Sequence, residues 1–92
     1  MTRERTIEAD AKRDIEAAGG WVLKWKSPGQ NGVPDRIVFW PETMHFVEFK
    51  RPKGTPRSNQ VTVHKRLLTY GHRVVVLDSR EAVAAYIKKY GP

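Results

Sequence analysis

The sequence predicts an α/β fold in which helices flank a small mixed sheet, in the order helix, strand, strand, strand, helix, strand, helix. Three segments carry apolar residues every three or four positions, which is the period of a helix with one buried face. Four shorter runs alternate in polarity or are rich in β-branched and aromatic residues, as strands are. A length of 92 residues allows one domain, which we expect to span residues 1–92.

The first two elements are a helix over residues 3–18 and a strand over residues 21–26. Thr2 can cap the helix, and Gly19-Gly20 can end it because glycine tolerates left-handed backbone geometry. The apolar stripe of the helix consists of Ile7, Ala11, Ile15 and Ala18. The strand alternates Trp21, Leu23 and Trp25 with Val22, Lys24 and Lys26, which predicts that one face is buried.

A hairpin follows, with strands over residues 36–40 and 45–50 joined by the four residues 41–44. Pro52 cannot donate a hydrogen bond to a sheet, so the second strand must end near it. If residues 41–44 form the loop, Trp40 pairs with His45, and a two-residue turn at Glu42-Thr43 gives the same register.

The remaining elements are a helix from about residue 56 to 70, a strand over residues 73–77 and a final helix. Thr55-Pro56 is a good helix start, since a capping hydroxyl precedes a proline at the first helical position. The continuous apolar run at residues 73–77 predicts an interior strand that is covered on both faces. Asp78 and Glu81 form a pair resembling a capping box for the last helix.

The charge of the chain favours polyanionic partners. Seventeen Lys and Arg residues against ten Asp and Glu give a net charge of +7 and a pI near 10.1, which favours nucleic acid. The absence of cysteine excludes disulfides, thiolate metal sites and cysteine nucleophiles. The N-terminus has no apolar run typical of a signal peptide or membrane anchor, so we expect a cytoplasmic protein.

Two acids and a lysine on the hairpin form the candidate active site. In the expected register Asp35 faces Lys50, Ile37 faces Glu48, and all these side chains share one face of the sheet. Asp35 and Glu48 are then diagonal neighbours, with Cα atoms roughly 7–8 Å apart. A register shifted by one residue would separate the two carboxylates onto opposite faces.

This cluster predicts a divalent-cation site. Burying two carboxylates is costly unless a partner compensates their charge. Mg²⁺ is suited, because it takes few protein ligands and keeps waters and a substrate phosphate oxygen, and Mn²⁺ is expected to substitute. The backbone carbonyl of Phe49 could supply a third protein oxygen. Lys50 could orient or deprotonate the water that attacks a phosphodiester.

An acidic residue two positions before a lysine is a weak signal, because Asp10-Ala11-Lys12 repeats it. On a helix, residues two apart point to different sides, so Asp10 and Lys12 cannot share a metal. The alternative for Glu48 and Lys50 is an exposed cross-strand ion cluster, and Asp35 could be a simple turn residue after Pro34.

Three segments in this order resemble the PD-(D/E)XK nuclease superfamily, and more closely the VRR-NUC family. They are Gly32-Val33-Pro34-Asp35-Arg36, Glu48-Phe49-Lys50 and Ser58-Asn59-Gln60. The resemblance covers most of the chain, from the pair Ile7-Glu8 to residues 74–78. It implies a restriction-endonuclease-like αβββαβ core and a metal-dependent DNA endonuclease.

The resemblance also implies roles for individual residues. Asp35 and Glu48 match metal ligands and Lys50 a catalytic lysine, while Gln60 matches a supporting glutamine at the start of the next helix. Glu8 matches the first-helix acid, acting at the metal through a water, although periodicity alone favours its pairing with Lys12. Stand-alone members of this size resemble homodimeric viral or bacterial nucleases that cut branched DNA such as four-way junctions, which implies a bacterial cell or a phage-infected host.

Basic residues near the hairpin are candidate DNA contacts. They lie at both ends of the hairpin and at the start of the next helix, which favours a phosphate-binding track. The candidates are Lys24, Lys26, Arg36, Arg51, Lys53 and Arg57. Trp25 and Trp40 could stack on bases or form a dimer face, with core packing as the default for both. His45, His64 and His72 lack metal-binding spacing.

Two other interpretations of the sequence stay open. One is a catalytically silent, basic nucleic-acid-binding module on the same scaffold. The other is a structural homodimer in which the hairpin charges are a surface ion network.

Overall fold

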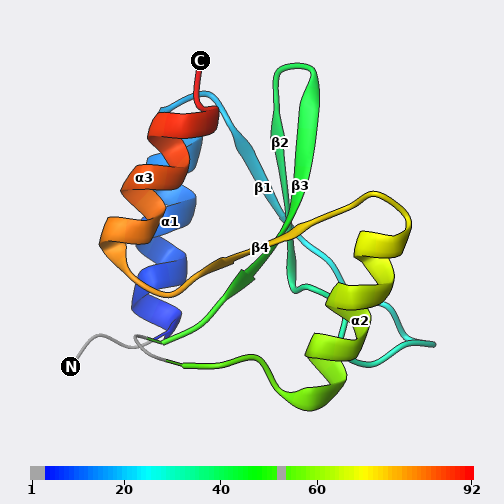
Figure 1. The fold of residues 1–92 in the computed structure, drawn as a ribbon. Helices are drawn as coiled ribbons and strands as arrows, with labels where there is room; N and C mark the ends of the chain where they lie inside the picture. Colours follow the sequence, from blue (N-terminus) through cyan, green and yellow to red (C-terminus); the bar gives the residue numbers. More distant parts are fainter. Residues whose placement is uncertain (1–3, 52–53) are drawn as a thin grey trace.

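The computed structural model describes residues 4–51 and 54–92 and contains seven elements in the predicted order (Figure 1). The expected cap Thr2 and the strand-ending Pro52 lie outside the described residues. The elements are α1 (Glu4–Ala17), β1 (Trp21–Lys24), β2 (Arg36–Trp40), β3 (Thr43–Phe49), α2 (Ser58–Thr69), β4 (Val74–Leu77) and α3 (Arg80–Tyr90).

The sheet is mixed, as predicted, with the strands in the order β1-β2-β3-β4. β1, β2 and β3 are antiparallel neighbours, and β4 runs parallel to β3 because α2 carries the chain back across the sheet. The prediction that residues 73–77 form an interior strand is wrong. β4 is an edge strand, and its apolar run reflects helices on both sides rather than a strand on each flank.

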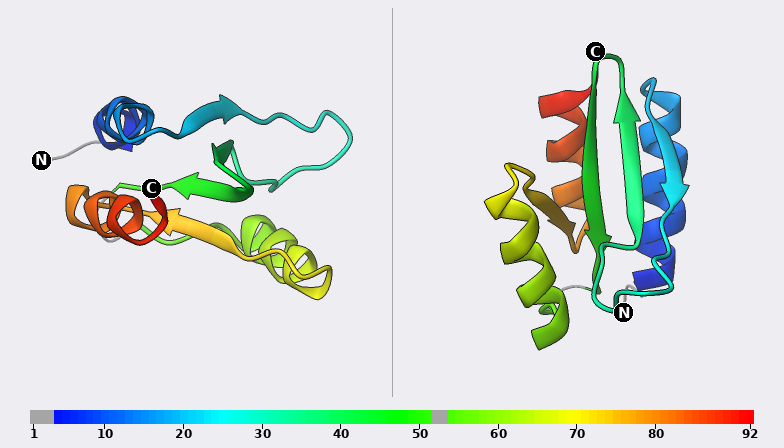
Figure 2. Two further views of the ribbon diagram at one scale, coloured as in Figure 1. Left: turned by 90° about the horizontal axis from the view of Figure 1, so that it is seen from above. Right: turned by 90° about the vertical axis from the view of Figure 1, so that its right-hand side faces the viewer.

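Two helices cover one face of the sheet and one covers part of the other (Figure 2). α1 and α3 pack on the face that carries Val38, Val47 and Phe49, all of which are fully buried. α2 lies over the opposite face along the β4 side, and the outer surface of β1 and β2 has no helix over it (Figure 2). The two faces therefore differ: one holds the core, and on the other the part over β1 and β2 has no helix over it.

The β2–β3 hairpin differs from the expected register by two residues. Trp40 pairs with Thr43 rather than with His45, so Pro41 and Glu42 form the turn. Glu42 has a left-handed φ of 68° after a proline, as in a type II turn. Because side chains alternate with a period of two, this even shift keeps each of them on its expected face. Extending the register by one residue brings Asp35 directly opposite Glu48.

Both later helices begin at residues other than the predicted ones. α2 starts at Ser58 instead of residue 56, because the Gln60 side chain accepts a hydrogen bond from the Arg57 backbone N–H at 2.9 Å. α3 is capped by Ser79 rather than Asp78, since the Ser79 hydroxyl accepts from the backbone N–H of Ala82 at 3.0 Å. In each case a neighbouring side chain pairs with a terminal N–H group of the helix.

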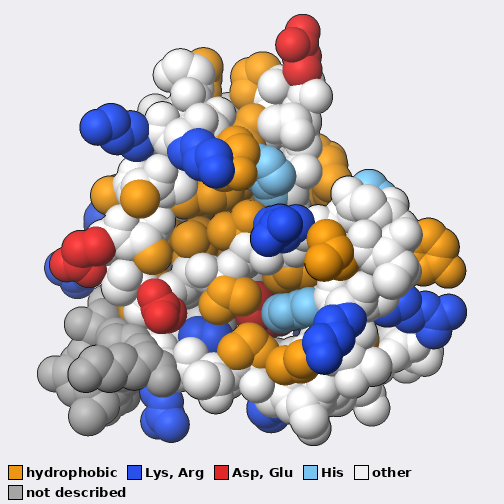
Figure 3. Space-filling view, in the orientation of Figure 1, with side chains coloured by type: hydrophobic (Ala, Val, Ile, Leu, Met, Phe, Trp, Pro, Cys, Tyr) orange, Lys and Arg blue, Asp and Glu red, His pale blue; other side chains and the backbone are white. Residues whose placement is uncertain are grey.

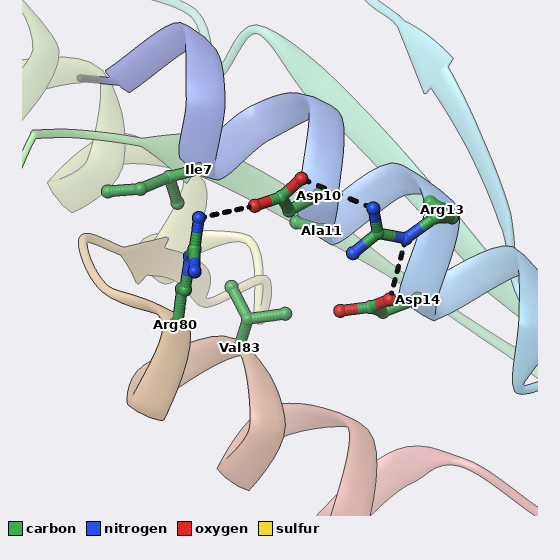
Figure 4. Close-up of a pocket in the computed structure, with 7 residues that line it drawn as sticks. All are labelled: Ile7, Asp10, Ala11, Arg13, Asp14, Arg80 and Val83. Atoms are coloured by element: carbon green, nitrogen blue, oxygen red, sulfur yellow. Dashed lines mark hydrogen bonds and ion pairs between the residues drawn. The ribbon is translucent and has the colours of Figure 1, made fainter. Parts of the chain in front are cut away.

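A hollow of about 260 Å³ lies between α1 and α3 (Figure 4). Asp10 fills its polar side by pairing with Arg80 at 3.0 Å and with Arg13 at 3.4 Å. The pair with Arg80 joins α1 to α3, and the pair with Arg13 lies within α1, so the hollow is structural. α1, with 14 residues, is the longest helix in the described part of the chain, and none there could cross a membrane.

Candidate active site

The two hairpin acids meet in a hollow of about 210 Å³, hereafter the acidic pocket. Its walls come from the start of α1, the loop between β1 and β2, the end of β3 and the start of α2. The residues lining it are Glu4, Gly32, Val33, Asp35, Glu48, Lys50, Arg57, Asn59 and Gln60. The structure thus brings together Asp35, Glu48, Lys50 and Gln60, which the sequence analysis had singled out.

Glu48 is at the centre of the acidic pocket and is only 2% exposed. Its neighbours Val47 and Phe49 point toward α1 and α3, so the alternation of the strand directs Glu48 to the side of α2. One carboxylate oxygen lies 3.9 Å from Lys50 Nζ, and the other lies 3.8 Å from His64 Nε2. Both contacts exceed hydrogen-bond length, so Glu48 is surrounded by polar groups without being satisfied by them.

Burial and mutual repulsion disfavour the charged forms of both acids. Loss of solvent, followed by the charge of Asp35, raises the pKa of Glu48 to about 7. Burial, followed by the charge of Glu4, raises the pKa of Asp35, although the backbone N–H of Phe49 opposes this shift. Two adjacent acids with raised pKa values form a site that a cation would stabilise.

Unpaired carboxylate oxygens indicate that these residues suit a metal ion. Asp35 Oδ1 and Glu48 Oε1 are both buried without a hydrogen-bond partner, which is costly unless a ligand satisfies them. Within residues 4–51 and 54–92, no three His, Asp or Glu side chains converge to enclose an ion by themselves. The donor set therefore fits a hard cation that takes two carboxylates and completes its shell with backbone oxygen and water.

The loop that carries Asp35 is held tightly against α2. Gly32 has a φ of 84°, and a Cβ added there would lie 2.6 Å from the backbone oxygen of Asn59. Only glycine permits this approach without displacing the loop or the helix. The buried Gln60 side chain, which caps α2, lines the acidic pocket beside this contact. The close contact between Gly32 and Asn59 consequently helps to position both Asp35 and Gln60.

The first-helix acid in the acidic pocket is Glu4 rather than Glu8. Glu8 forms an ion pair with Arg36 and lines a separate hollow of about 470 Å³. Glu4, one turn earlier, lines the acidic pocket, and its charge raises the pKa of both Asp35 and Glu48. The expected pairing of Glu8 with Lys12 is not among the ion pairs of the described residues.

The candidate DNA-contacting residues fall into two groups. Arg51 and Arg57 line a hollow of about 510 Å³ that shares Glu4 and Lys50 with the acidic pocket. Lys24 and Arg36 line the hollow around Glu8, where Arg36 is already paired. Lys26 is exposed and lines neither hollow, and Lys53 lies outside the described residues. Figure 3 shows basic side chains scattered around one face of the molecule, with hydrophobic side chains gathered near its centre.

His64 is the site residue that sequence reasoning missed. In the sequence, its spacing from the other histidines does not predict a metal site. Its Nε2 is buried without a hydrogen-bond partner and faces Glu48. Burial, followed by the charge of Lys50, lowers the pKa of His64, which disfavours its charged form. Its position one turn after Gln60 on α2 was the available signal.

Comparisons with known proteins place these observations in context. The chain is 42% identical over 82 residues to the "Putative nuclease p44" of Acyrthosiphon pisum secondary endosymbiont phage 1, an alignment that covers 88% of each protein. A solved structure described as a VRR_NUC domain matches with a TM-score of 0.87 and 34% identity, over 98% of this chain and 99% of that one. No protein-family model matches the chain.

Proposed function

This chain belongs to the VRR-NUC family of nucleases, and from that premise we propose that it is a divalent-metal-dependent endonuclease that hydrolyses phosphodiester bonds in DNA. The observation that supports metal dependence most directly is the buried pair Asp35 and Glu48, each with an unpartnered oxygen. A protein would not retain two such acids beside one another unless a ligand compensated them.

Asp35 and Glu48 are the proposed metal ligands, with the backbone carbonyl of Phe49 as a third oxygen. Glu4 is the proposed acid from α1, acting at longer range, because it lines the acidic pocket while Glu8 is paired with Arg36. A divalent cation held there would polarise the scissile phosphate and lower the pKa of a bound water. Mg²⁺ is the proposed ion and Mn²⁺ a substitute, since the donors are hard oxygens.

Lys50 is the proposed catalytic lysine. Its Nζ lies 3.9 Å from Glu48 Oε2 and lines the same pocket, so it can reach a water that approaches a phosphate bound there. As a neutral amine, Lys50 can accept a proton from that water at Nζ, and as a cation it can stabilise charge that develops on the phosphate. Gln60 is the proposed supporting residue, because its amide oxygen caps α2 and its amide nitrogen donates no hydrogen bond within residues 4–51 and 54–92.

Branched DNA is the proposed substrate class. Arg51 and Arg57 lie beside the acidic pocket, and Lys24 and Arg36 lie around a hollow on another side of the hairpin. Two separate basic areas would suit two DNA arms better than one straight duplex. Phosphate contacts of this kind make binding fall steeply with salt concentration.

A homodimer is the proposed assembly. The outer surface of β1 and β2 carries Trp21, which is 57% exposed, and Phe39, whose ring lies 5.7 Å from that of Trp21. An exposed aromatic pair on a sheet face without a covering helix supports association with a second copy. A Trp21→Glu variant should sediment as a monomer where the parent sediments as a dimer.

The decisive experiment compares cleavage of four-way junction, linear duplex and single-stranded DNA. Each substrate is incubated with Mg²⁺, with Mn²⁺ and with chelator, alongside the Glu48→Ala variant. We expect metal-dependent cleavage that is fastest on the junction and lost in the variant. Salt-sensitive binding without any cleavage, unchanged by the substitution, would favour the silent binding module instead.

A further inference from the structure

A second cavity, of about 300 Å³, lies between α2 and the loop that follows β1. We call it the aromatic pocket, because the aromatic side chains of Trp25 and Tyr70 both line it. Val63 and Leu67 from α2 complete its apolar lining, and Arg66 lies at its edge. A cavity of this size can hold a small planar ligand, but it is too small for a folded partner.

The aromatic pocket adjoins the acidic pocket. Val33 lines both cavities, so an occupant of one lies next to an occupant of the other. The backbone N–H of Trp25 also donates to the carbonyl oxygen of Asp35 at 2.9 Å, which fixes the aromatic wall to the proposed metal-binding residue. A DNA strand whose phosphate enters the acidic pocket would therefore carry its neighbouring nucleotides past the aromatic pocket.

The lining chemistry favours a nucleobase over an aliphatic group. Tyr70 follows the end of α2 and is 69% exposed, which leaves a ring face free for stacking. Trp25 is anchored from one side by Phe46, at 5.1 Å between ring centroids. Ser27 and Gln30 offer hydroxyl and amide groups suited to the polar edge of a base. Arg66, one turn before Tyr70, supplies a cation for the adjoining phosphate.

We propose that the aromatic pocket receives one unstacked nucleobase of the strand that is being cut, close to the scissile phosphate. This inference rests on the proposed function and narrows its substrate class. A base in continuous duplex must first be unstacked, which costs free energy. A base at a branch point or in a single strand is already partly free, so the pocket favours DNA that is interrupted near the cleavage site.

The test is a double-mutant cycle that combines protein variants with abasic DNA. Binding affinity is measured in chelator, where a metal-dependent nuclease cannot cut. A four-way junction is prepared with a single abasic site, which is moved one position at a time along each strand. The parent protein should lose about tenfold in affinity at one or two positions, within the range for stacking of one base. Tyr70→Ala should lose about tenfold on intact DNA and nothing further on DNA abasic at those positions, while Tyr70→Phe should bind like the parent.

Leu68→Ala is the matched control, because Leu68 is an exposed residue on the same helix that does not line the pocket. It should bind every substrate like the parent protein. If no abasic position weakens binding by the parent, the pocket holds no base. If losses from Tyr70→Ala and from the abasic site multiply instead, Tyr70 contacts something else, such as a protein side chain, and the inference is overturned.

This experiment can fail or succeed independently of the proposed nuclease function. Binding is measured without metal, so the cycle gives its answer even if no substrate is cleaved. Intact metal-dependent cleavage with no abasic effect would remove this inference and leave the nuclease assignment in place. Conversely, the protein could show the expected abasic-site effect and yet cleave no DNA with any metal. That result would support the base-binding pocket and contradict the proposed nuclease activity.

Discussion

The chain contains two segments with the same local pattern, Asp10-Ala11-Lys12 on α1 and Glu48-Phe49-Lys50 at the end of β3, and their acids have different surroundings. Asp10 contacts Arg13 and Arg80, and it helps to join α1 to α3. Glu48 is buried with an unpartnered oxygen, and Lys50 lines the same pocket. One acid is paired across two helices, while the other, in the proposed function, binds a metal ion.

Secondary structure causes this difference. Residues two apart project from the same face of a strand, whereas on a helix they point to different sides. Lys12 accordingly lines the hollow around Glu8 and not the one around Asp10. An acid whose charge is fully paired contributes to stability, and an acid whose partner is missing is available for chemistry. Four substitutions test this contrast.

The largest effect is expected from Glu48→Gln. The amide keeps the shape of the side chain but removes the negative charge that would hold a cation, so cleavage should fall by about a thousandfold or more. Asp10→Asn, the same change in the helical segment, should cleave within about twofold of the parent. Initial rates on a four-way junction with Mg²⁺ measure both. Equal losses in the two variants would mean that the contrast is not catalytic.

Lys50→Met should lower the cleavage rate by about a hundredfold to ten-thousandfold, the range for loss of a proton-transferring group. Binding of the junction in chelator should change little, since methionine retains the apolar part of the chain. Lys12→Met is its counterpart in the helical segment and should leave the cleavage rate unchanged. Full activity in Lys50→Met would remove the catalytic role of this lysine.

The pH dependence of stability should depend on Glu48. Because its pKa rises from 4.5 to about 7, the folded protein binds more protons than the unfolded chain between these values. The free energy of unfolding in chelator should therefore fall as pH rises through that window, by on the order of 2 kcal/mol. Urea titrations at pH 4.5 and pH 8 measure this, and Glu48→Gln should flatten the slope. A fall that persists in Glu48→Gln would assign it to other groups.

The smallest effect is expected from Asp10→Asn on stability. The Arg80 side chain is largely exposed, and the ion pair should contribute less than about 1 kcal/mol. Urea unfolding in low and high salt should show a small difference that salt reduces further. A loss of several kcal/mol would indicate that Asp10 carries more of the α1–α3 contact than its ion pairs suggest.

The sequence was sufficient for the order of elements and for the grouping of Asp35, Glu48 and Lys50, because both follow from periodicity. It was insufficient for the hairpin register. The turn uses Glu42 in a left-handed conformation, which neither Glu nor its neighbours signal as Asn-Gly would. The site was nevertheless predicted on the correct face, since an error of two residues does not change the face.

The other differences between prediction and structure depend on tertiary contacts, which residue spacing does not reveal. Glu4 and Glu8 lie on the same side of α1, about one turn or about 6 Å apart along the helix axis. This offset places Glu4 at the acidic pocket and Glu8 beside Arg36. The edge position of β4 depends on which strand it joins, and its composition is compatible with either place. His64 came to Glu48 through the packing of α2 against the sheet, which is a tertiary contact.

The Pro41-Glu42 turn lies at the opposite end of the hairpin from the acidic pocket. Next to the turn, Trp40 donates a hydrogen bond from Nε1 to the Tyr86 hydroxyl at 2.9 Å, which fastens the strand to α3 before the chain reverses. This contact holds β2 on α3 at the end of the hairpin that lies away from Asp35 and Glu48. The tip of the hairpin is therefore a place to attach a fluorophore at a distance from the acidic pocket.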